Sequence, residues 1–178
     1  MKEEPKKKKK KTQDSSDYWR QLGRLENLNK NSEVKVGVIF SYHSLIIGLF
    51  ADKIDYFKLL FSENTIIFIC FILWTMATVI SVYFCFKCFV PIILKSKYEP
   101  NVFFFEDVVH RFGSIDDYVK KVLSVTEDNE KLFIQLAEQL HVKSSIVSFK
   151  FRNVKRAIFF FMWSIMFIIV TGVVMLIS

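Results

Sequence analysis

Long runs of apolar residues alternate with polar segments along this chain of 178 residues. Thr65–Phe86 contains 22 residues without a charge, and Ala157–Ile177 contains 21. At about 1.5 Å per residue, each run forms a helix of ~31–33 Å, long enough to cross a hydrocarbon core of about 30 Å. A helix of a soluble protein rarely stays apolar on every side over about six turns. Both runs therefore predict transmembrane helices.

A third apolar run, Val36–Ala51, is shorter and more polar. It has 16 uncharged residues, or about 24 Å of helix, and carries the polar stretch 41–44 in its middle. Snorkelling of flanking lysines, thinning of the bilayer or contact with other helices allows so short a run to span. A re-entrant or interfacial segment is the alternative. We predict a span, because it accounts for the distribution of charge.

Lysine and arginine are unevenly distributed between the segments that flank these runs. Residues 1–35 contain 11, residues 52–64 contain two, residues 87–156 contain 12, and none follows Arg156. Cytoplasmic segments of membrane proteins are enriched in Lys and Arg, and three spans place both rich segments on one side. Two spans would place them on opposite sides. We therefore predict a multi-pass protein of the cell (inner) membrane, with its N-terminus in the cytoplasm and its C-terminus outside.

The net charge of +7 arises mostly in a lysine-rich tail. Met1–Lys11 carry seven lysines and two glutamates, which leaves only about +2 for the remaining residues. The basic composition therefore gives no indication of a nucleic-acid partner. A run such as Lys6–Lys11 is drawn to anionic membrane lipids, or it merely keeps the chain soluble. We expect residues 1–14 to be disordered and residues 15–178 to form a single membrane domain.

The polar segments beside the spans predict a small helical region in the cytoplasm. Ser15–Lys30 shows apolar residues at helical spacing, which predicts an amphipathic helix that lies on the membrane surface or packs against the second cytosolic segment. That second segment, residues 95–156, predicts a helical stretch over 102–123 and a long helix from 127 that continues as the third span. The fold class is thus an all-α integral membrane protein with three transmembrane helices and a small helical cytosolic region.

Capping signals set the boundaries of these cytosolic helices. Gly113 interrupts the stretch 102–123, and Ser114 with Asp117 matches a capping box that starts a new helix. Ser124 with Glu127 matches a second capping box, which predicts the start of the long helix. A bend near Ser144 and Ser145 is compatible with the sequence.

No catalytic constellation is recognisable in the sequence. The five glycines are not clustered, so a glycine-rich phosphate loop is excluded, and no Gly-x-Ser-x-Gly motif occurs. The three histidines lack a metal-binding spacing, and Cys85 with Cys88 has no second pair to complete a zinc site. We therefore predict a protein that is not an enzyme and that holds no metal and no cofactor.

His43 is the first candidate for function, because it lies in the middle of the membrane if the first run spans. An ionisable group in that position marks a functional site by default. It can equally hold the helices together through a hydrogen bond to Ser81 or Thr78 on a neighbouring helix.

A basic cluster before the third span is the second candidate. It consists of Lys143, Lys150, Arg152, Lys155 and Arg156. Anchoring of the span on the positive-inside side explains the cluster. The alternative is a cytosolic pocket for an anionic ligand, in which Arg grips a phosphate through a two-pronged contact and Lys acts as a point charge.

Several short motifs, in this order of parts, give the chain a family resemblance. They are Glu33-Val-Lys35-Val36 at the start of the first span, Ser41 and His43 within it, Phe103-Phe-Phe-Glu-Asp107, Leu136-Ala-Glu-Gln-Leu140 and Phe149-Lys-Phe-Arg152. Over about residues 17–178 the chain resembles the Pycsar transmembrane effectors, the membrane arm of the bacterial pyrimidine cyclase system against phage. Glu33 and His43 depart from the Asp and Asn that are more usual in that family.

The resemblance implies a function and a ligand. A partner cyclase makes a cyclic pyrimidine nucleotide, cCMP or cUMP, during infection, and the effector binds it, rearranges or assembles into a homo-oligomer and impairs the membrane, so that the cell dies or stops growing. We expect ligand contacts among Glu33, Lys35, Arg111, Lys150 and Arg152. The alternative is a small three-span anchoring or regulatory subunit of a membrane complex with no nucleotide ligand.

Overall fold

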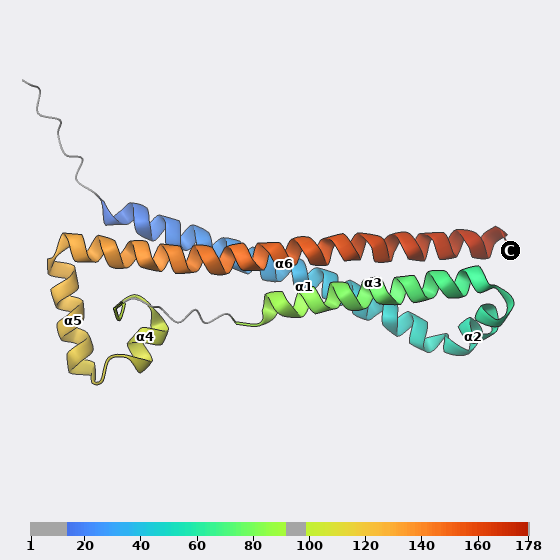
Figure 1. Ribbon diagram of the computed structural model, residues 1–178, viewed down its shortest axis with the longest axis horizontal. Coiled ribbons are helices and arrows are strands. Elements are labelled where there is room, and N and C mark those ends of the chain that lie inside the picture. The colour runs from blue at the N-terminus through green and yellow to red at the C-terminus, as the bar shows by residue number, and fades with distance from the viewer. Residues whose placement is uncertain (1–13, 92–98, 178) are drawn as a thin grey trace, which may run out of the picture. The chain divides into compact units, whose positions relative to one another are not determined.

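The computed structural model describes residues 14–91 and 99–177, which form α-helices joined by turns (Figure 1). The helices are α1 (Ser15–Asp52), α2 (Ile54–Glu63), α3 (Thr65–Phe89), α4 (Phe105–His110), α5 (Ile115–Glu127) and α6 (Asn129–Ile177). Three of them, α1, α3 and α6, are long and apolar enough to cross a membrane. Within the described ranges there is no strand. The predicted all-α membrane fold with three spans is therefore confirmed.

Two predictions concern residues outside this description. The lysine-rich tail, predicted to be disordered over 1–14, is described only at Asp14, so the run Lys6–Lys11 is not covered. Residues 95–98 of the predicted cytosolic region also lie outside the described residues. At the border of the tail, the carboxylate of Asp14 accepts the N–H of Ser16 at 3.0 Å, which satisfies one of the free donors at the start of α1.

The amphipathic segment and the first span form one helix. α1 has 38 residues, or about 57 Å, and continues without a break from the segment 15–30 into the run 36–51. No proline interrupts the junction, and the hydroxyl of Ser32 donates to the carbonyl of Leu28 at 2.9 Å without disturbing the helix. A re-entrant segment requires the chain to reverse inside the membrane, and α1 shows no reversal. The amphipathic segment is also not a separate helix on the membrane surface.

The last helix is longer than any other and begins later than predicted. α6 has 49 residues and runs through Ser144 and Ser145 without interruption. The predicted capping box at Ser124 is wrong, because α5 continues through that residue to Glu127.

Asp128 caps α6 instead of Ser124. The carboxylate of Asp128 accepts the N–H groups of Lys131 at 3.3 Å and Glu130 at 3.0 Å. Hydrogen bonds from Lys131 and Glu130 and the charge of the Lys131 ammonium hold the pKa of Asp128 below its usual value. Only the ionised carboxylate is a full acceptor for these donors, so the cap is complete at neutral pH.

By packing, the described chain divides into two units. The head unit consists of residues 14–24 and 99–141, and the membrane unit consists of residues 25–91 and 142–177. α1 and α6 each contribute residues to both. The assignment of 15–178 to a single domain therefore stays a prediction.

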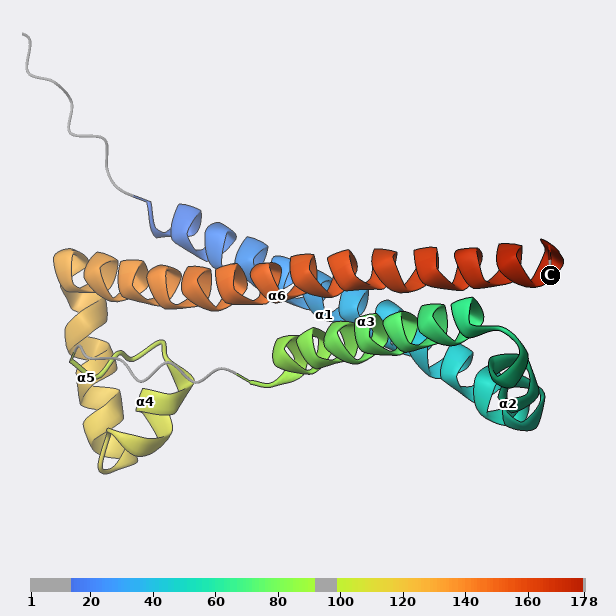
Figure 2. The ribbon, with the colours of Figure 1, turned by 45° about the vertical axis from the view of Figure 1, so that its right-hand side comes forward.

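The membrane unit is a bundle of α1, α3 and the second part of α6, and α2 packs at the start of α3 (Figure 1, Figure 2). Its apolar core is made by Val36, Ile39, Cys85, Cys88, Val154 and Ala157, with Phe84 and Phe161 packed beside them. The two cysteines are fully buried in this core.

Val36 of α1 meets Cys85 and Cys88 near the end of α3, whereas Phe50, farther along α1, meets Trp74, which is earlier in α3. Helix α3 therefore runs antiparallel to α1. It also runs antiparallel to α6, because Ser81 meets Ala157 and Thr78 meets Ser164.

Polar side chains join the three helices deep inside this bundle. The hydroxyl of Ser81 donates to the carbonyl of Ala157 at 3.0 Å, and it lies 3.0 Å from Nε2 of His43. Since a hydroxyl has one proton to donate, Nε2 carries the ring proton and donates it to Ser81. Thr78 and Ser164 form a second pair at 3.1 Å. The predicted hydrogen bond from His43 to Ser81 is confirmed, and it links α1 to α3 and, through Ser81, to α6.

In the head unit, the segment before α4 is bound to the first turns of α6. The side-chain amide of Asn101 donates to the carbonyl of Gln135 at 2.8 Å and to the carboxylate of Glu138 at 3.1 Å. The side-chain oxygen of Gln135 accepts the N–H of Val102 at 3.0 Å, and that of Asn101 accepts the N–H of Phe103 at 2.9 Å. Asn101 is 3% exposed, so these bonds replace water that the buried segment has lost.

The remaining head contacts are aromatic or involve helix caps. The ring of Trp19 meets the ring of Phe103 edge-on, with 5.4 Å between ring centres, and the ring of Tyr18 lies 5.4 Å from that of Phe133. The start of α1 therefore packs against the second cytosolic segment, which was one of our two alternatives.

The hydroxyl of Ser114 accepts the N–H of Asp117 at 3.2 Å, which confirms the predicted cap. The stretch 102–123 thus contains α4 and the first part of α5, separated by the turn around Gly113.

We predict that Asn101→Ala loosens the segment 101–104 from α6. The substitution removes the donors to Gln135 and Glu138 and leaves buried groups without partners, at a cost of about 1–3 kcal/mol. Hydrogen exchange of the Val102 and Phe103 amides, measured on the full chain in detergent micelles, should become faster. Asn129→Ala, at the exposed first residue of α6, is the matched control and should leave these amides unchanged. Equal exchange in both variants would contradict the anchoring role of Asn101.

Candidate functional site

A charged pair joins α1 to α6 just before both helices enter the apolar core of the membrane unit. Nζ of Lys150 donates to Oε1 of Glu33 at 2.5 Å. The side chain of Lys150 is 5% exposed, whereas that of Glu33 is 40% exposed. On α1, Glu33 precedes Val36, the first residue of the core, by one turn. The pair therefore lies at the border between the polar segments and the apolar run.

An amide completes what we call the Glu33 cluster, formed by Asn29, Glu33 and Lys150. The side-chain N–H of Asn29 lies 3.5 Å from the same Oε1 of Glu33, one helical turn away. The side-chain oxygen of Asn29 is buried and has no hydrogen-bond partner among the described residues. The Glu33 cluster thus offers an ammonium group, a carboxylate and an unused amide acceptor within a small space.

The charges of the Glu33 cluster allow another anion to replace Glu33 beside Lys150. A buried ammonium group is costly unless an anion stays beside it, and removal of that anion leaves an uncompensated charge. The half-exposed Glu33 supplies this anion at present. Another anion of similar size that reaches Lys150 from the exposed side of Glu33 can take its place, and Glu33 then returns to water. The arrangement therefore suits an anionic ligand that competes with a carboxylate.

The other predicted ligand residues lie elsewhere. Lys35 and Arg152 are exposed, and each is two positions from a member of the Glu33 cluster, which places it on another side of its helix. Arg111 belongs to the head unit, where its guanidinium lies 3.3 Å from the carboxylate of Asp107. The structure therefore brings Glu33 and Lys150 together but does not add Lys35 or Arg152 to them. The ligand-binding roles of all five residues stay predictions.

The rest of the basic cluster differs from Lys150 in its surroundings. Lys143 lies 3.7 Å from Glu26 on α1, with both side chains partly exposed. The guanidinium of Arg156 lies over the ring of Phe84 at 5.4 Å, and Lys155 is exposed. These positions are those of cations that stay near water at the membrane border. Lys150 differs from them because its side chain is buried where it meets α1.

Sequence reasoning missed the polar neighbours of the charged pair. Ser32 and Asn153 are 2% and 3% exposed, and each bonds back to a carbonyl of its own helix, Ser32 to Leu28 and Asn153 to Phe149. A signal was present, because Ser32 falls on the same helical face as the core residue Val36. A polar residue that falls on the apolar face of a helix, at the end of that face, is predicted to be buried.

Comparison with known protein families decides the identity of the chain. A family model described as the Pycsar effector protein domain matches residues 17–178. The chain belongs to this family. The match covers the described residues of both units almost completely, and it includes the whole Glu33 cluster. Comparisons with curated proteins and with solved structures found no match.

Membership of the Pycsar effector family confirms the resemblance inferred from the sequence motifs. It places the protein among the effectors of Pycsar antiphage defence, and the three spanning helices make it a membrane protein. The family also implies a cyclic nucleotide signal from a partner cyclase. It is a family of membrane effectors and not of known enzymes, which agrees with the lack of a catalytic motif in the sequence.

We predict that Glu33→Gln destabilises the fold, because the charge of buried Lys150 loses its counter-ion. The loss of a partner from a fully buried pair costs about 3–5 kcal/mol, and the exposure of Glu33 reduces our expectation to about 2–3 kcal/mol. Combining Glu33→Gln with Lys150→Met should restore most of the stability. Denaturant unfolding of the full chain in detergent micelles, followed by circular dichroism, measures the free energy of unfolding.

The pair formed by Glu26 and Lys143 provides the matched control. Its atoms lie 3.7 Å apart and its side chains are 65% and 32% exposed, so Glu26→Gln should change the free energy of unfolding by less than about 1 kcal/mol. If Glu33→Gln costs no more than Glu26→Gln, the buried pair does not hold α1 to α6.

Proposed function

We propose that this Pycsar effector responds to a cyclic pyrimidine nucleotide, cCMP or cUMP, and impairs membrane integrity, so that the infected cell dies or stops growing. The observation that carries the proposal is the family match over residues 17–178. Three helices able to span a membrane supply a means of acting on the bilayer. The Glu33 cluster supplies a group that recognises an anion at the border of these spans.

The chemistry of the ligand fits the Glu33 cluster. A cyclic nucleotide carries one negative charge on its phosphodiester, as Glu33 does on its carboxylate, so the two can exchange on the ammonium group of Lys150. The free amide oxygen of Asn29 can accept a hydrogen bond from an N–H group of the pyrimidine base. Lys35, Arg111 and Arg152 remain proposed as additional ligand contacts.

Exchange of the anion would change how α1 is held against α6. Each of these helices is continuous from the head unit into the membrane unit, so a shift where Glu33 meets Lys150 moves the spans themselves. A ligand shifts such an equilibrium only if it binds one arrangement better than the other. A tenfold shift in population requires about 1.4 kcal/mol of differential affinity. We propose that the shifted form assembles into a homo-oligomer.

The distribution of charge supports a cytoplasmic location for the nucleotide site. Residues 1–35 and 87–156 contain nearly all the lysine and arginine, and both belong to the same side if α1, α3 and α6 span. We therefore propose that the N-terminus and the head unit face the cytoplasm of the cell, where a partner cyclase releases its product, and that the C-terminus lies outside.

We predict nucleotide-dependent leakage from vesicles that contain the purified protein. Vesicles of phosphatidylethanolamine and phosphatidylglycerol are loaded with a fluorescent dye, and cCMP, cUMP, cAMP and cGMP are added separately. Leakage is expected with one or both pyrimidine nucleotides only. Lys150→Met should abolish the response, because the site then lacks the cation that attracts the phosphate. Lys143→Met removes a partly exposed lysine from the same helix and should respond as the native protein does.

Two outcomes would overturn parts of this proposal. If none of the four nucleotides binds or causes leakage, the pyrimidine nucleotide is not the signal, and an anchoring or regulatory subunit without a nucleotide ligand becomes the better account. If a pyrimidine nucleotide causes leakage in Lys150→Met as strongly as in the native protein, the Glu33 cluster is not the binding site.

A further inference from the structure

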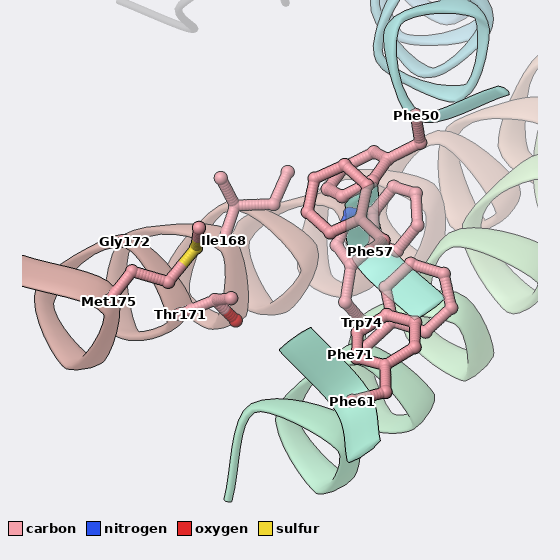
Figure 3. A pocket seen from close by; sticks show the side chains of 9 residues that line it. All are labelled: Phe50, Phe57, Phe61, Phe71, Trp74, Ile168, Thr171, Gly172 and Met175. Carbon is pink, nitrogen blue, oxygen red and sulfur yellow. The ribbon is translucent and has the colours of Figure 1, made fainter. Parts of the chain in front are cut away.

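A cavity of about 150 Å³ lies in the membrane unit near the turn that carries α2 (Figure 3). Its walls are aromatic on one side and aliphatic on the other: Phe50, Phe57, Phe61, Phe71 and Trp74 face Ile168, Thr171, Gly172 and Met175 of α6. The hydroxyl of Thr171 already donates its proton to the carbonyl of Phe167 at 2.8 Å, so it has no donor to offer a molecule in the cavity. Apolar cavities of about this size stay dry and accept hydrocarbon molecules.

A second cavity of about 290 Å³ adjoins the first and shares Phe50, Phe57 and Ile168 with it. Ile46 and Leu49 of α1 extend its apolar wall. Its rim carries two charges where α1 ends, because Asp52 and Lys53 also line it and lie 3.1 Å apart. Their side chains are 71% and 69% exposed. We call these two neighbouring cavities, with their common lining and the ionic rim, the aromatic channel.

Ring contacts between tilted aromatic side chains form one wall of the aromatic channel. Phe50 lies 4.6 Å from both Phe57 and Trp74 between ring centres, and Phe61 lies 4.8 Å from Phe71. Phe57 and Phe61 are one turn apart on α2, so this short helix turns both rings toward the spans. Aromatic side chains have few rotatable bonds, and a wall made of them loses little entropy when a ligand binds.

We propose that the aromatic channel binds one acyl chain of a phospholipid, with the headgroup at Asp52 and Lys53. The channel is lined by α1, α3 and α6, all of which are long and apolar enough to cross a membrane, so a bilayer around these helices brings lipid hydrocarbon to it. The rim offers one charge of each sign, which complements a zwitterionic headgroup such as phosphatidylethanolamine. Lys53 pairs with the phosphate, and Asp52 pairs with the ammonium group.

This lipid site is separate from the proposed nucleotide site. On α1, Phe50 is 17 residues beyond Glu33, or about 26 Å along the helix. The acyl chain fills the space between α2, α3 and α6, where the protein's own side chains leave a gap. The proposal rests on the lining and the charges of the aromatic channel, and it holds whether or not a nucleotide binds at Lys150.

Photo-crosslinking tests the proposal on the full-length protein. The chain is reconstituted in vesicles of phosphatidylethanolamine and phosphatidylglycerol that contain a trace of phosphatidylethanolamine with a diazirine in its acyl chain. After illumination, labelled residues are located by peptide mass spectrometry. We expect Phe57, Phe71 and Met175 to be labelled several-fold more than Met162, which is exposed on α6 outside the channel. Equal labelling at Met162 would overturn the site.

Two glycines give a matched pair of variants. A Cβ added at Gly172, which lines the channel, meets no atom within 4 Å, so the first carbon of the side chain in Gly172→Leu has room. A Cβ added at Gly48 also meets nothing within 4 Å, and Gly48 is not part of the lining. Gly172→Leu should abolish the excess labelling, and Gly48→Leu should preserve it. Unchanged labelling in Gly172→Leu would contradict a ligand inside the channel.

Two further measurements distinguish the kind of ligand. The indole N–H of Trp74 is buried without an acceptor among the described residues, and Trp74→Phe removes it while a ring stays in the wall. Labelling should survive this change, because a hydrocarbon chain needs no donor. Loss of the labelling in Trp74→Phe would indicate that the channel binds a ligand with a hydrogen-bond acceptor and not an acyl chain. Unlabelled phosphatidylethanolamine should compete better than phosphatidylglycerol, and equal competition would overturn the assignment of the headgroup.

Discussion

Hydrocarbon provides no hydrogen-bonding partner, and this constraint governs most polar groups of the membrane unit. Backbone groups are satisfied by continuous helices. Most polar side chains bond back to their own helix, as Thr75 does to the carbonyl of Phe71, or pair with another helix, as His43 does with Ser81. The buried indole N–H of Trp74 is an exception among the described residues. Pairing between helices fixes the order of the bundle, because a shifted helix would leave a buried polar group without a partner. The three spans are therefore held in register by few but specific contacts.

The same constraint explains why the charged pair lies where it does. Glu33 and Lys150 are the last charges of α1 and α6 that face each other before the apolar core begins at Val36 and Val154. Deeper in the bilayer the pair would cost more, and farther out it would be screened by water and bind weakly. At the border it is strong enough to hold two helices and exposed enough to be exchanged. These are the properties that the proposed exchange of Glu33 for a nucleotide requires.

The head unit uses a different means of holding its parts together. Its segments bury the apolar side chains of Val102, Phe104 and Val125. In addition, the side chains of Asn101 and Gln135 bind the backbone of the partner segment directly. Asp107 adds a buried carboxylate that accepts the N–H of Asn101 at 3.0 Å. Such a network is rigid when complete and fails when one member is lost. The head unit therefore joins α4 and α5 to α6 with a defined geometry although it is small.

Local patterns in the sequence determined the helices and their membrane character. The apolar runs were long enough to identify the spans, the spacing of apolar residues in 15–30 identified the amphipathic helix, and Ser114 marked the start of α5. The boundary at Ser124 was wrong because two capping signals, at Ser124 and Asp128, lie four residues apart and only packing selects between them. The sequence predicted that α6 continues into the third span, as the structure confirms. The continuity of α1 was beyond local signals, since a polar segment and an apolar run can join with or without a break.

The candidate sites depend on tertiary structure more than the helices do. Composition identified a basic cluster before the third span, but its members are equivalent in sequence, and only the contact with α1 distinguishes buried Lys150 from exposed Arg152. The aromatic channel brings together Phe57 of α2 and Gly172 of α6, which are far apart in the chain. The sequence by itself determined which segments are helical and which enter the membrane, because those properties depend on residues within a few turns. Tertiary structure alone decided which side chains meet, because burial and pairing depend on the neighbouring helix.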